Sequence, residues 1–171
     1  MILPFTRGNV VKTLIIGLMN GTSETTFEPL ATTSRAMVVQ VLYNMSDRPR
    51  VYAQKAFDDV VEGQWYYDAV NWAKAVGVCN GTSETEFSPN DPVTREQLAS
   101  ILRRYASFSG IATYDAELPA NASVSNWAKK DVAWAYAEGI LTSAQMVAAA
   151  KNANRAEVAM AIYAYLTGTA R

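Results

Sequence analysis

The chain has 171 residues, of which half are hydrophobic and 18% are charged, and its net charge is −1 at neutral pH. Such a composition predicts a buried core, in one domain or in three small units that share it. The near-neutral charge argues against nucleic acid as the partner, and no apolar stretch is long enough to cross a bilayer. One cysteine and no histidine exclude a disulfide framework, a Cys/His metal site and Cys-His or Ser-His-Asp catalysis. We therefore expect no metal and no other cofactor.

A hexapeptide, NGTSET, occurs at 20–25 and again at 80–85. The spacing of 60 residues continues beyond it, because an arginine stands at Arg35, at Arg95 and again at Arg155. A fixed internal period indicates a repeat architecture. We predict three units, each built around an arginine that opens a helix.

Each of these arginines precedes an apolar stripe. The stripe residues are Val38, Val41, Leu42 and Met45 in unit one, Leu98, Ile101, Leu102 and Tyr105 in unit two, and Val158, Ala161, Ile162 and Tyr165 in unit three. Apolar residues at positions i, i+3, i+4 and i+7 predict one buried helix face. Three helices with the same stripe should pack together as a central bundle, so the predicted fold is all-α.

A shorter helix is expected before each arginine helix. In unit one it would run from Val10 to Leu18, and in unit two from about Tyr67 to Val76. Ser46 to Lys55 is polar and is interpreted as a linker. The loop of unit three lacks NGTSET and the Phe-x-Pro element, and the helical pattern of Ala144 to Lys151 predicts that this loop is remodelled.

The four tryptophans divide into two pairs. Trp72 and Trp134 fall inside predicted helices and should belong to the core. Trp65 and Trp127 stand at the starts of helices, near junctions between units. An aromatic face at such a place can stack on a sugar ring, so we predict that these two tryptophans line a groove.

The residues before the three arginines are good helix N-caps. They are Ser34, Thr94 and Asn154, and the last two also fit a capping box, with Gln97 and Glu157 respectively. The arginine is then the first residue of each helix, where the helix dipole favours negative charge instead. A cation repeated at this position indicates that a negative group lies beside it.

Two interpretations of that negative group stay open on the residues alone. In the first, it belongs to a ligand, because an arginine fork and a helix N-terminus together suit a carboxylate or phosphate. In the second, each arginine pairs with a protein carboxylate, such as Asp59 or Glu96, and only fixes neighbouring units to one another.

These motifs resemble the S-layer homology (SLH) family. Its pattern is Phe-x-Asp-Val, then Trp-Tyr, a Gly-x-x-x-Gly loop, Phe-x-Pro, and a helix start like Thr-Arg-Ala-Glu. Unit two carries Phe57 to Val60, Trp65 and Tyr66, Gly77 to Gly81, Phe87 to Pro89, and Thr94 to Glu96. Unit one keeps Gly17 to Gly21, Phe27 to Pro29 and Ser34 to Ala36, and unit three keeps Trp127, Gly139 and Asn154 to Glu157. The resemblance covers essentially the whole chain.

The resemblance implies a pseudo-threefold, three-pronged helical spindle around a central three-helix bundle. Its repeats would be 1–48, 56–108 and 117–168. The first repeat is truncated, because it lacks the Phe-x-Asp-Val and Trp-Tyr opening. The third is divergent, because Asn121 stands where the family has aspartate and its loop has no Phe-x-Pro.

The resemblance also implies a function, that of a non-catalytic module that anchors a protein to the cell wall. Its partner would be a secondary cell-wall polysaccharide attached to peptidoglycan and often pyruvylated, held in grooves between repeats where the motif arginine contacts the acidic ketal. The ligand-binding residues that we predict are Arg35, Arg95, Arg155, Trp65, Trp127, Asp59, Gly21 and Gly81. The junctions of Arg35 with unit two and of Arg95 with unit three look most complete.

The implied location is the cell wall or surface layer of a Gram-positive bacterium, outside the cell and without insertion into the membrane. The first twelve residues lack the pattern of a signal peptide. We therefore expect the chain to be part of a longer secreted protein.

Three other functions are considered. One is a structural role in a self-assembling surface layer, with other surface-layer subunits as partners and the arginines as structural pins. The second is a dockerin-like calcium-dependent module, but the loop around Asn80, Thr82, Glu84 and Asp91 lacks the central glycine and the carboxylate density of a calcium loop. The third is an all-α glycosidase with paired carboxylates, although acids in a repeated turn are better explained as solvated loop residues.

Overall fold

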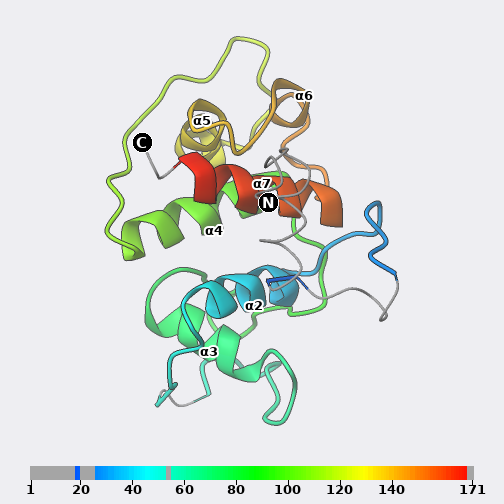
Figure 1. Ribbon diagram of the computed structural model, residues 1–171, viewed down its shortest axis with the longest axis vertical. Coiled ribbons are helices and arrows are strands. Elements are labelled where there is room, and N and C mark those ends of the chain that lie inside the picture. The colour runs from blue at the N-terminus through cyan, green and yellow to red at the C-terminus, as the bar shows by residue number, and fades with distance from the viewer. Residues whose placement is uncertain (1–17, 20–25, 53–54, 169–171) are drawn as a thin grey trace, which may run out of the picture.

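Helices form all the regular secondary structure in the residues that the computed structural model describes, 18–19, 26–52 and 55–168. They are α2 (Arg35–Met45), α3 (Tyr67–Ala75), α4 (Arg95–Phe108), the 3-10 helix η1 (Asn126–Ala128), α5 (Lys129–Ala137), α6 (Ser143–Met146) and α7 (Arg155–Gly168) (Figure 1). The prediction of an all-α fold is confirmed. The helix expected from Val10 to Leu18 lies outside the described residues except for its last residue, and Gly21 lies outside them too.

The helices α2, α4 and α7 begin at the three repeated arginines, and the predicted caps are present. Ser34 Oγ accepts the amide three residues further on at 3.3 Å. Thr94 forms the capping box with Gln97. Asn154 and Glu157 form another, because the amide of each donates to the side chain of the other, at 3.1 and 2.9 Å.

A closed ring of three backbone hydrogen bonds joins the units just before these caps. The amide of Thr33 donates to the carbonyl of Ala153 at 3.1 Å, that of Ala153 to Val93 at 2.8 Å, and that of Val93 to Thr33 at 2.9 Å. All three residues are fully buried and are spaced by the repeat period. The repeat in the sequence therefore becomes a threefold pseudosymmetry in space.

The first amide of each arginine helix donates to a loop of another unit. These bonds run from Arg35 to the carbonyl of Asp91 at 3.0 Å, from Arg95 to Lys151 at 3.0 Å, and from Arg155 to Ala31 at 2.9 Å. The first amides of a helix have no partner within it. Each helix is therefore capped by the next unit around a closed circle.

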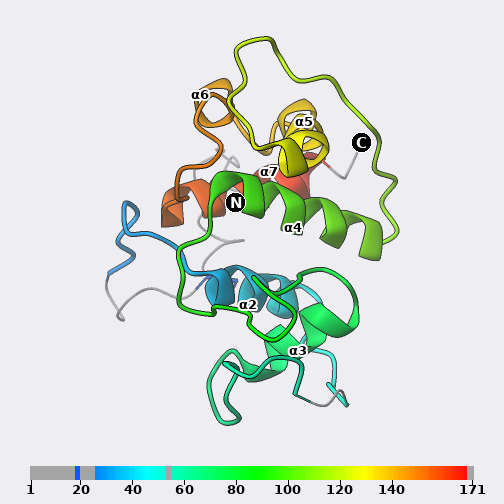
Figure 2. The same ribbon diagram turned by 180° about the vertical axis from the view of Figure 1, so that it is seen from behind.

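The helices that pack side by side come from adjacent units. Helix α3 of unit two packs against α2 of unit one, and α5 of unit three packs against α4 of unit two. In Figures 1 and 2 the arginine helices lie between α3 at one end and α5 with α6 at the other. The rings of Tyr105 and Tyr165, 5.6 Å apart, join α4 to α7 within one hydrophobic core. Packing thus crosses the boundaries that the sequence repeats define.

Trp72 and Trp134 belong to this core, as predicted, since both side chains are buried. The turns that follow their helices place Gly77 at φ 76° and Gly139 at φ 71°. A left-handed glycine is a common way to end a helix, and both glycines serve this purpose.

The prediction of a helix over Ala144 to Lys151 is wrong in its extent. Helix α6 covers only Ser143–Met146, and the chain then continues in turns. The reason lies in the carbonyls of Ala149 and Lys151, which accept the first two amides of α4. In a continuous helix, these carbonyls would accept hydrogen bonds within the helix or point away from the first amides of α4.

Thr33 provides a stability test of the ring. Its Oγ1 is buried and has no hydrogen-bond partner among the described residues, whereas the equivalent residues Val93 and Ala153 are apolar. A buried hydroxyl without a partner is unfavourable. We expect Thr33→Val to raise the free energy of unfolding by about 1 kcal/mol, as measured by urea denaturation. The matched control, Val93→Thr, introduces the same defect and should lower it by a similar amount; a destabilised Thr33→Val variant would contradict the account.

Candidate functional site

A cavity of about 460 Å³ lies at the meeting point of the three units. It is lined by Arg35 of α2, by the loop 79–82 of unit two, by one face of α4, and by Trp127 of η1. Its volume falls within the range of small-molecule sites. Because one cavity receives side chains from all three units, we take it as the candidate functional site.

The polar lining of the cavity is positively charged. Arg35 and Arg104 both line it, and no carboxylate of the described residues does. Neutral hydrogen-bonding side chains add to the two cations, among them Thr82, Gln97 and Ser100. Two guanidinium groups with neutral donors around them suit an anion.

Arg35 reaches the cavity from a fixed position. Its Nε donates to the carbonyl of Phe87 at 2.8 Å and its Nη2 to that of Asn80 at 2.9 Å, and its guanidinium lies 4.8 Å from the centre of the Phe87 ring. The residue is only 5% exposed. Arg35 therefore ties α2 to the loop of unit two, while Nη1 donates to none of the described residues.

Arg104 enters the cavity from α4, one helical turn beyond Ser100, and its side chain is exposed. None of the ion pairs found among the described residues involves it. One repeat period away in either direction stand Asn44 and Ala164. The second arginine is therefore specific to unit two.

Cys79 lines the cavity wall together with Arg35 and Arg104. Burial raises the pKa of its thiol, and the charges of Arg35 and then Arg104 act in the opposite direction. The Sγ atom of Cys79 lies 4.0 Å from Nη2 of Arg35. With a raised pKa the thiol stays protonated, and the buried Cys79 packs as a small hydrophobic residue.

Gly81 shapes the loop that forms one wall of the cavity. A Cβ atom at this position would overlap the carbonyl oxygens of Glu86 and Ser83 and would lie 2.6 Å from the Phe57 ring. Only glycine fits such a close approach. The predicted site residue Gly81 is thus placed in the cavity wall, where its lack of a side chain matters.

Neither carboxylate that we considered as an arginine partner pairs with an arginine. Asp59 accepts the amides of Phe87 at 2.9 Å and Ser88 at 2.7 Å. Glu96 accepts the amide and the hydroxyl of Ser125, at 3.1 and 2.9 Å. Both carboxylates are used to hold loop backbone, so this part of the structural interpretation is wrong.

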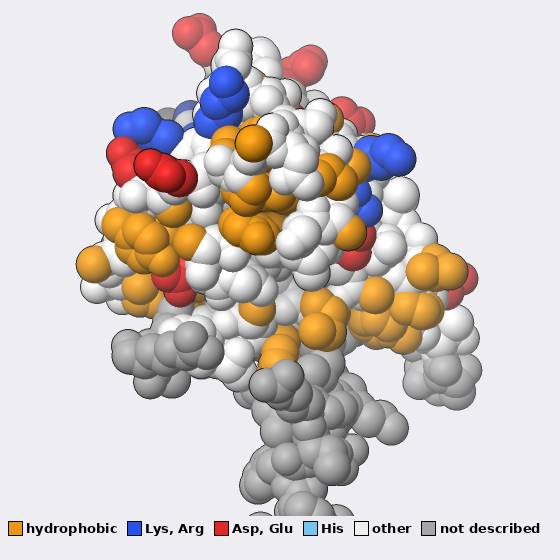
Figure 3. All heavy atoms as spheres, turned by 90° about the horizontal axis from the view of Figure 1, so that it is seen from above, with side chains coloured by type: hydrophobic (Ala, Val, Ile, Leu, Met, Phe, Trp, Pro, Cys, Tyr) orange, Lys and Arg blue, Asp and Glu red, His pale blue; other side chains and the backbone are white. Residues whose placement is uncertain are grey.

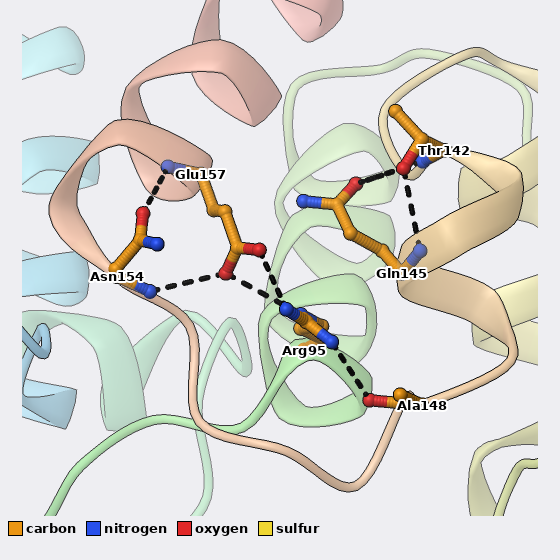
Figure 4. Close-up of polar contacts among 6 residues, drawn as sticks. All are labelled: Arg95, Thr142, Gln145, Ala148, Asn154 and Glu157. Carbon is orange, nitrogen blue, oxygen red and sulfur yellow. Dashed lines mark hydrogen bonds and ion pairs between the residues drawn. The ribbon is translucent and has the colours of Figure 1, made fainter. Parts of the chain in front are cut away.

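Arg95 nevertheless has a protein carboxylate as its partner, Glu157 of α7 (Figure 4). Nη2 lies 2.7 Å from Oε1, Nε donates to Oε2 at 3.3 Å, and Nη1 donates to the carbonyl of Ala148 at 3.1 Å. Val147 stands where unit two has Phe87, so no ring is available to Arg95. All three nitrogen atoms of its guanidinium are engaged within the protein.

Arg155 repeats the arrangement of Arg35. Its Nε donates to the carbonyl of Phe27 at 2.7 Å, and its guanidinium lies 4.6 Å from the centre of the Phe27 ring. The Phe-x-Pro element thus receives the arginine of another unit in the same way twice. Where that element is missing, in unit three, the carboxylate of Glu157 replaces it.

Trp65 and Trp127 differ in their relation to the cavity. Both are more than half exposed, at 56% and 57%. Trp127 lines the cavity, as a groove residue should. Trp65 is not part of its lining, and its ring meets that of Tyr66 edge-on at 5.1 Å.

The sequence reasoning missed Arg104, together with Gln97 and Ser100 on the same face of α4. A signal for them exists, because their spacing of three and four residues places them on one helix face, away from the apolar stripe. The repeat does not point to Arg104, because the other units have Asn44 and Ala164 at its position.

The Glu157 carboxyl predicts a dependence of stability on pH. Burial raises its pKa, but the hydrogen bonds from Arg95 and the Asn154 amide, and the charge of Arg95, outweigh burial and hold the pKa below its ordinary value. A lowered pKa stabilises the fold above the unfolded-state value, and this contribution is lost as the pH falls through the folded-state value. We expect the free energy of unfolding to fall below about pH 4.

The test is urea denaturation over a pH series. Glu157→Gln should be less stable than the parent at neutral pH and should lose less stability on acidification. Glu84→Gln, in an exposed loop, is the control and should behave as the parent protein does. If the free energy of unfolding falls equally steeply on acidification in Glu157→Gln and in the parent protein, the lowered pKa of Glu157 does not explain the dependence on pH.

The face shown in Figure 3 carries no dominant charge. On the face shown in Figure 3, basic and acidic side chains alternate, and neither sign forms a continuous region among the described residues. Within the described ranges, no helix has the length and apolar character needed to span a membrane. The same residues contain no group of three or more His, Cys, Asp and Glu side chains placed to hold a metal ion.

The ring of hydrogen bonds, the arginine helices and the shared cavity define a helical repeat module. Residues 56–99 match the family model of the S-layer homology domain. Residues 56–99 therefore form an S-layer homology domain match, as the motifs of unit two predicted. Domains of this family commonly anchor proteins at the cell surface and are not themselves catalytic.

Similar proteins include surface proteins and enzymes. The chain is 30% identical to exoglucanase XynX of Acetivibrio thermocellus over 87% of its own length and 14% of that protein. It is 31% identical to the surface-layer 125 kDa protein of Lysinibacillus sphaericus, over 75% of the chain and 11% of that protein. Amylopullulanase of Thermoanaerobacterium thermosulfurigenes is 30% identical over 87% and 8%, respectively. The chain thus spans a small part of each relative.

Proposed function

We propose that this chain is a non-catalytic anchoring module that binds an acidic, pyruvylated secondary cell-wall polysaccharide at the outer surface of a bacterium. The observation that carries the proposal is the cavity between Arg35, Arg104 and Trp127, which offers two cations and an aromatic face without any carboxylate among the described residues. An acidic sugar presents the complementary groups, namely a carboxylate and an apolar ring face.

The chemistry of binding follows from the lining. A pyruvate ketal carries a carboxylate, which guanidinium groups bind through charge-assisted hydrogen bonds. The exposed face of Trp127 would stack on the sugar ring, and Thr82 and Ser100 would exchange hydrogen bonds with its hydroxyls. No bond is made or broken in these contacts, so the module needs neither a nucleophile nor a cofactor.

The predicted ligand residues divide between contact and support in this proposal. Arg35 and Trp127 contact the ligand, while Gly81 and Asp59 give the loop its shape. Arg95, Arg155 and Trp65 lie outside this cavity, and they would belong to grooves at the other two junctions. Gly21 lies outside the described residues.

The relatives support an anchoring role. One is named as a surface-layer protein and two as enzymes, an exoglucanase and an amylopullulanase. A segment shared by proteins of such different names, and covering little of each, suits a common attachment module better than an active site. We propose that the chain belongs to a longer secreted protein and binds polymer attached to peptidoglycan.

A second candidate is a structural role in a surface layer, with other surface-layer subunits as partners. The partners of Arg95 and Arg155 within the chain favour it, because both arginines hold one unit to another. This role can coexist with polymer binding.

Sedimentation with purified cell walls tests the proposed function. We expect the protein to pellet with walls that carry their secondary polymer, and to stay in the supernatant after mild acid has removed the ketal groups. A chelator should change nothing, which separates this account from calcium-dependent binding. Equal pelleting with walls before and after ketal removal would overturn the proposal of acid recognition.

A further inference from the structure

We infer that Arg104, acting together with Nη1 of Arg35, recognises the acidic group of the ligand. This inference rests on the proposed function and narrows it to one pair of arginines and one groove, the cavity beside unit two. It assigns Arg95 and Arg155 chiefly to structure and gives the unrepeated Arg104 a role in specificity.

The first step concerns free donors. Every guanidinium nitrogen of Arg95 is occupied within the protein, and Arg35 keeps only one that donates to no described residue. Arg155 is buried against Phe27. Arg104 is exposed, and it enters into none of the ion pairs and hydrogen bonds found among the described residues. A ligand carboxylate can thus pair with the whole guanidinium group of Arg104 without displacing a protein contact.

The second step concerns charge. Arg35 and Arg104 line the same cavity. No carboxylate of the described residues lines this cavity to balance them. A carboxylate between them would meet Nη1 of Arg35 on one side and the free fork of Arg104 on the other, which is the strongest pairing that the cavity offers.

The third step concerns the other units. The position of Arg104 is filled by Asn44 in unit one and by Ala164 in unit three. Asn44 is engaged by its own neighbours, since its Oδ1 accepts from Gln40 at 3.0 Å and from Arg48 at 2.8 Å. Ala164 carries no polar group. The corresponding positions therefore supply no arginine, and we expect one acidic sugar to bind per chain.

The test is calorimetric titration with a defined probe, a hexosamine methyl glycoside that carries a pyruvate ketal. The same glycoside without the ketal is the neutral probe. We expect a stoichiometry of one for the parent protein and binding that is more than tenfold weaker for Arg104→Gln, while Arg104→Lys should lie between the two. Arg50→Gln removes another exposed arginine, outside the cavity, and should bind as the parent protein does.

The outcomes separate this inference from the proposed function. A parent protein that binds neither the probe nor cell walls overturns both. A parent protein that binds the probe, together with an Arg104→Gln variant that binds it equally well, overturns the role of Arg104 alone, as does a stoichiometry of two or three. If Arg104→Gln and Arg104→Lys both lose binding and also unfold at a lower temperature than Arg50→Gln, Arg104 is structural and the inference fails.

Discussion

Replacing Arg35 with methionine should lower the free energy of unfolding by about 3 kcal/mol. The side chain is almost fully buried, and it supplies the donors for the carbonyls of Phe87 and Asn80. Methionine keeps much of the volume but leaves the buried carbonyl of Phe87 without its donor, and an unsatisfied buried acceptor costs about 1–3 kcal/mol. The contact of the guanidinium with the Phe87 ring is lost as well.

Urea denaturation measures this loss, and Arg104→Met is the matched control. Arg104 lines the same cavity but is exposed and pairs with no described carboxylate, so its replacement should change stability by less than about 0.5 kcal/mol. Binding of the acidic probe should weaken in both variants. An Arg35→Met variant as stable as Arg104→Met would show that Arg35 does not hold α2 to unit two.

Replacing Gly81 with alanine should have a comparable effect for a different reason. The new Cβ would overlap two backbone carbonyl oxygens, those of Glu86 and Ser83, and backbone cannot move aside as a flexible side chain can. We expect a loss of about 3 kcal/mol in the free energy of unfolding, at the upper end of overpacking effects. Because residues 79–82 line the cavity, the same change should weaken binding of the acidic probe.

Gly77→Ala is the control for this prediction. Gly77 has a positive φ of 76°, but a Cβ there would meet nothing within 4 Å. Only conformational strain opposes this alanine, and it should cost about 1 kcal/mol. Thermal and urea unfolding of the two variants should therefore rank Gly81→Ala as the less stable. The reverse ranking would mean that the loop at 81–86 adapts to a side chain and does not fix the cavity wall.

The parts of the fold that the sequence predicted depend on short-range signals. The stripes on α2, α4 and α7 and the caps at Thr94 and Asn154 involve residues within one or two turns of each other, and the structure has them as predicted. The ring through Thr33 and the capping of each helix by the next unit join residues far apart in the sequence. Local patterns carry no information on such partners, although the equal spacing could have indicated a threefold closure.

The helix dipole predicts a negative group beside each arginine, but it does not predict which group that is. A cation at the first helical position was expected to require a negative neighbour. Carbonyl oxygens and an aromatic ring provide it for Arg35 and Arg155, and Glu157 provides it for Arg95. The sequence predicts Glu157 only as a capping-box residue, but its carboxylate both caps α7 and pairs with Arg95.

Arg104 shows the limit of reading function from a repeat. A search for what recurs every 60 residues finds the framework, because each unit must close the same ring and cap the same helix. The residue that we assign to ligand recognition stands where the other units have Asn44 and Ala164. In a chain built of repeats, a residue that occurs in one unit only can therefore carry function that the repeated residues do not reveal.

A crystal structure of the chain with the ketal-bearing hexosamine glycoside tests the central claim most directly. The account predicts one bound sugar in the cavity, its carboxylate within hydrogen-bond distance of Arg104 and of Nη1 of Arg35, and its ring against Trp127. A sugar bound at the Arg95 or the Arg155 junction, with the cavity beside unit two empty, would contradict it.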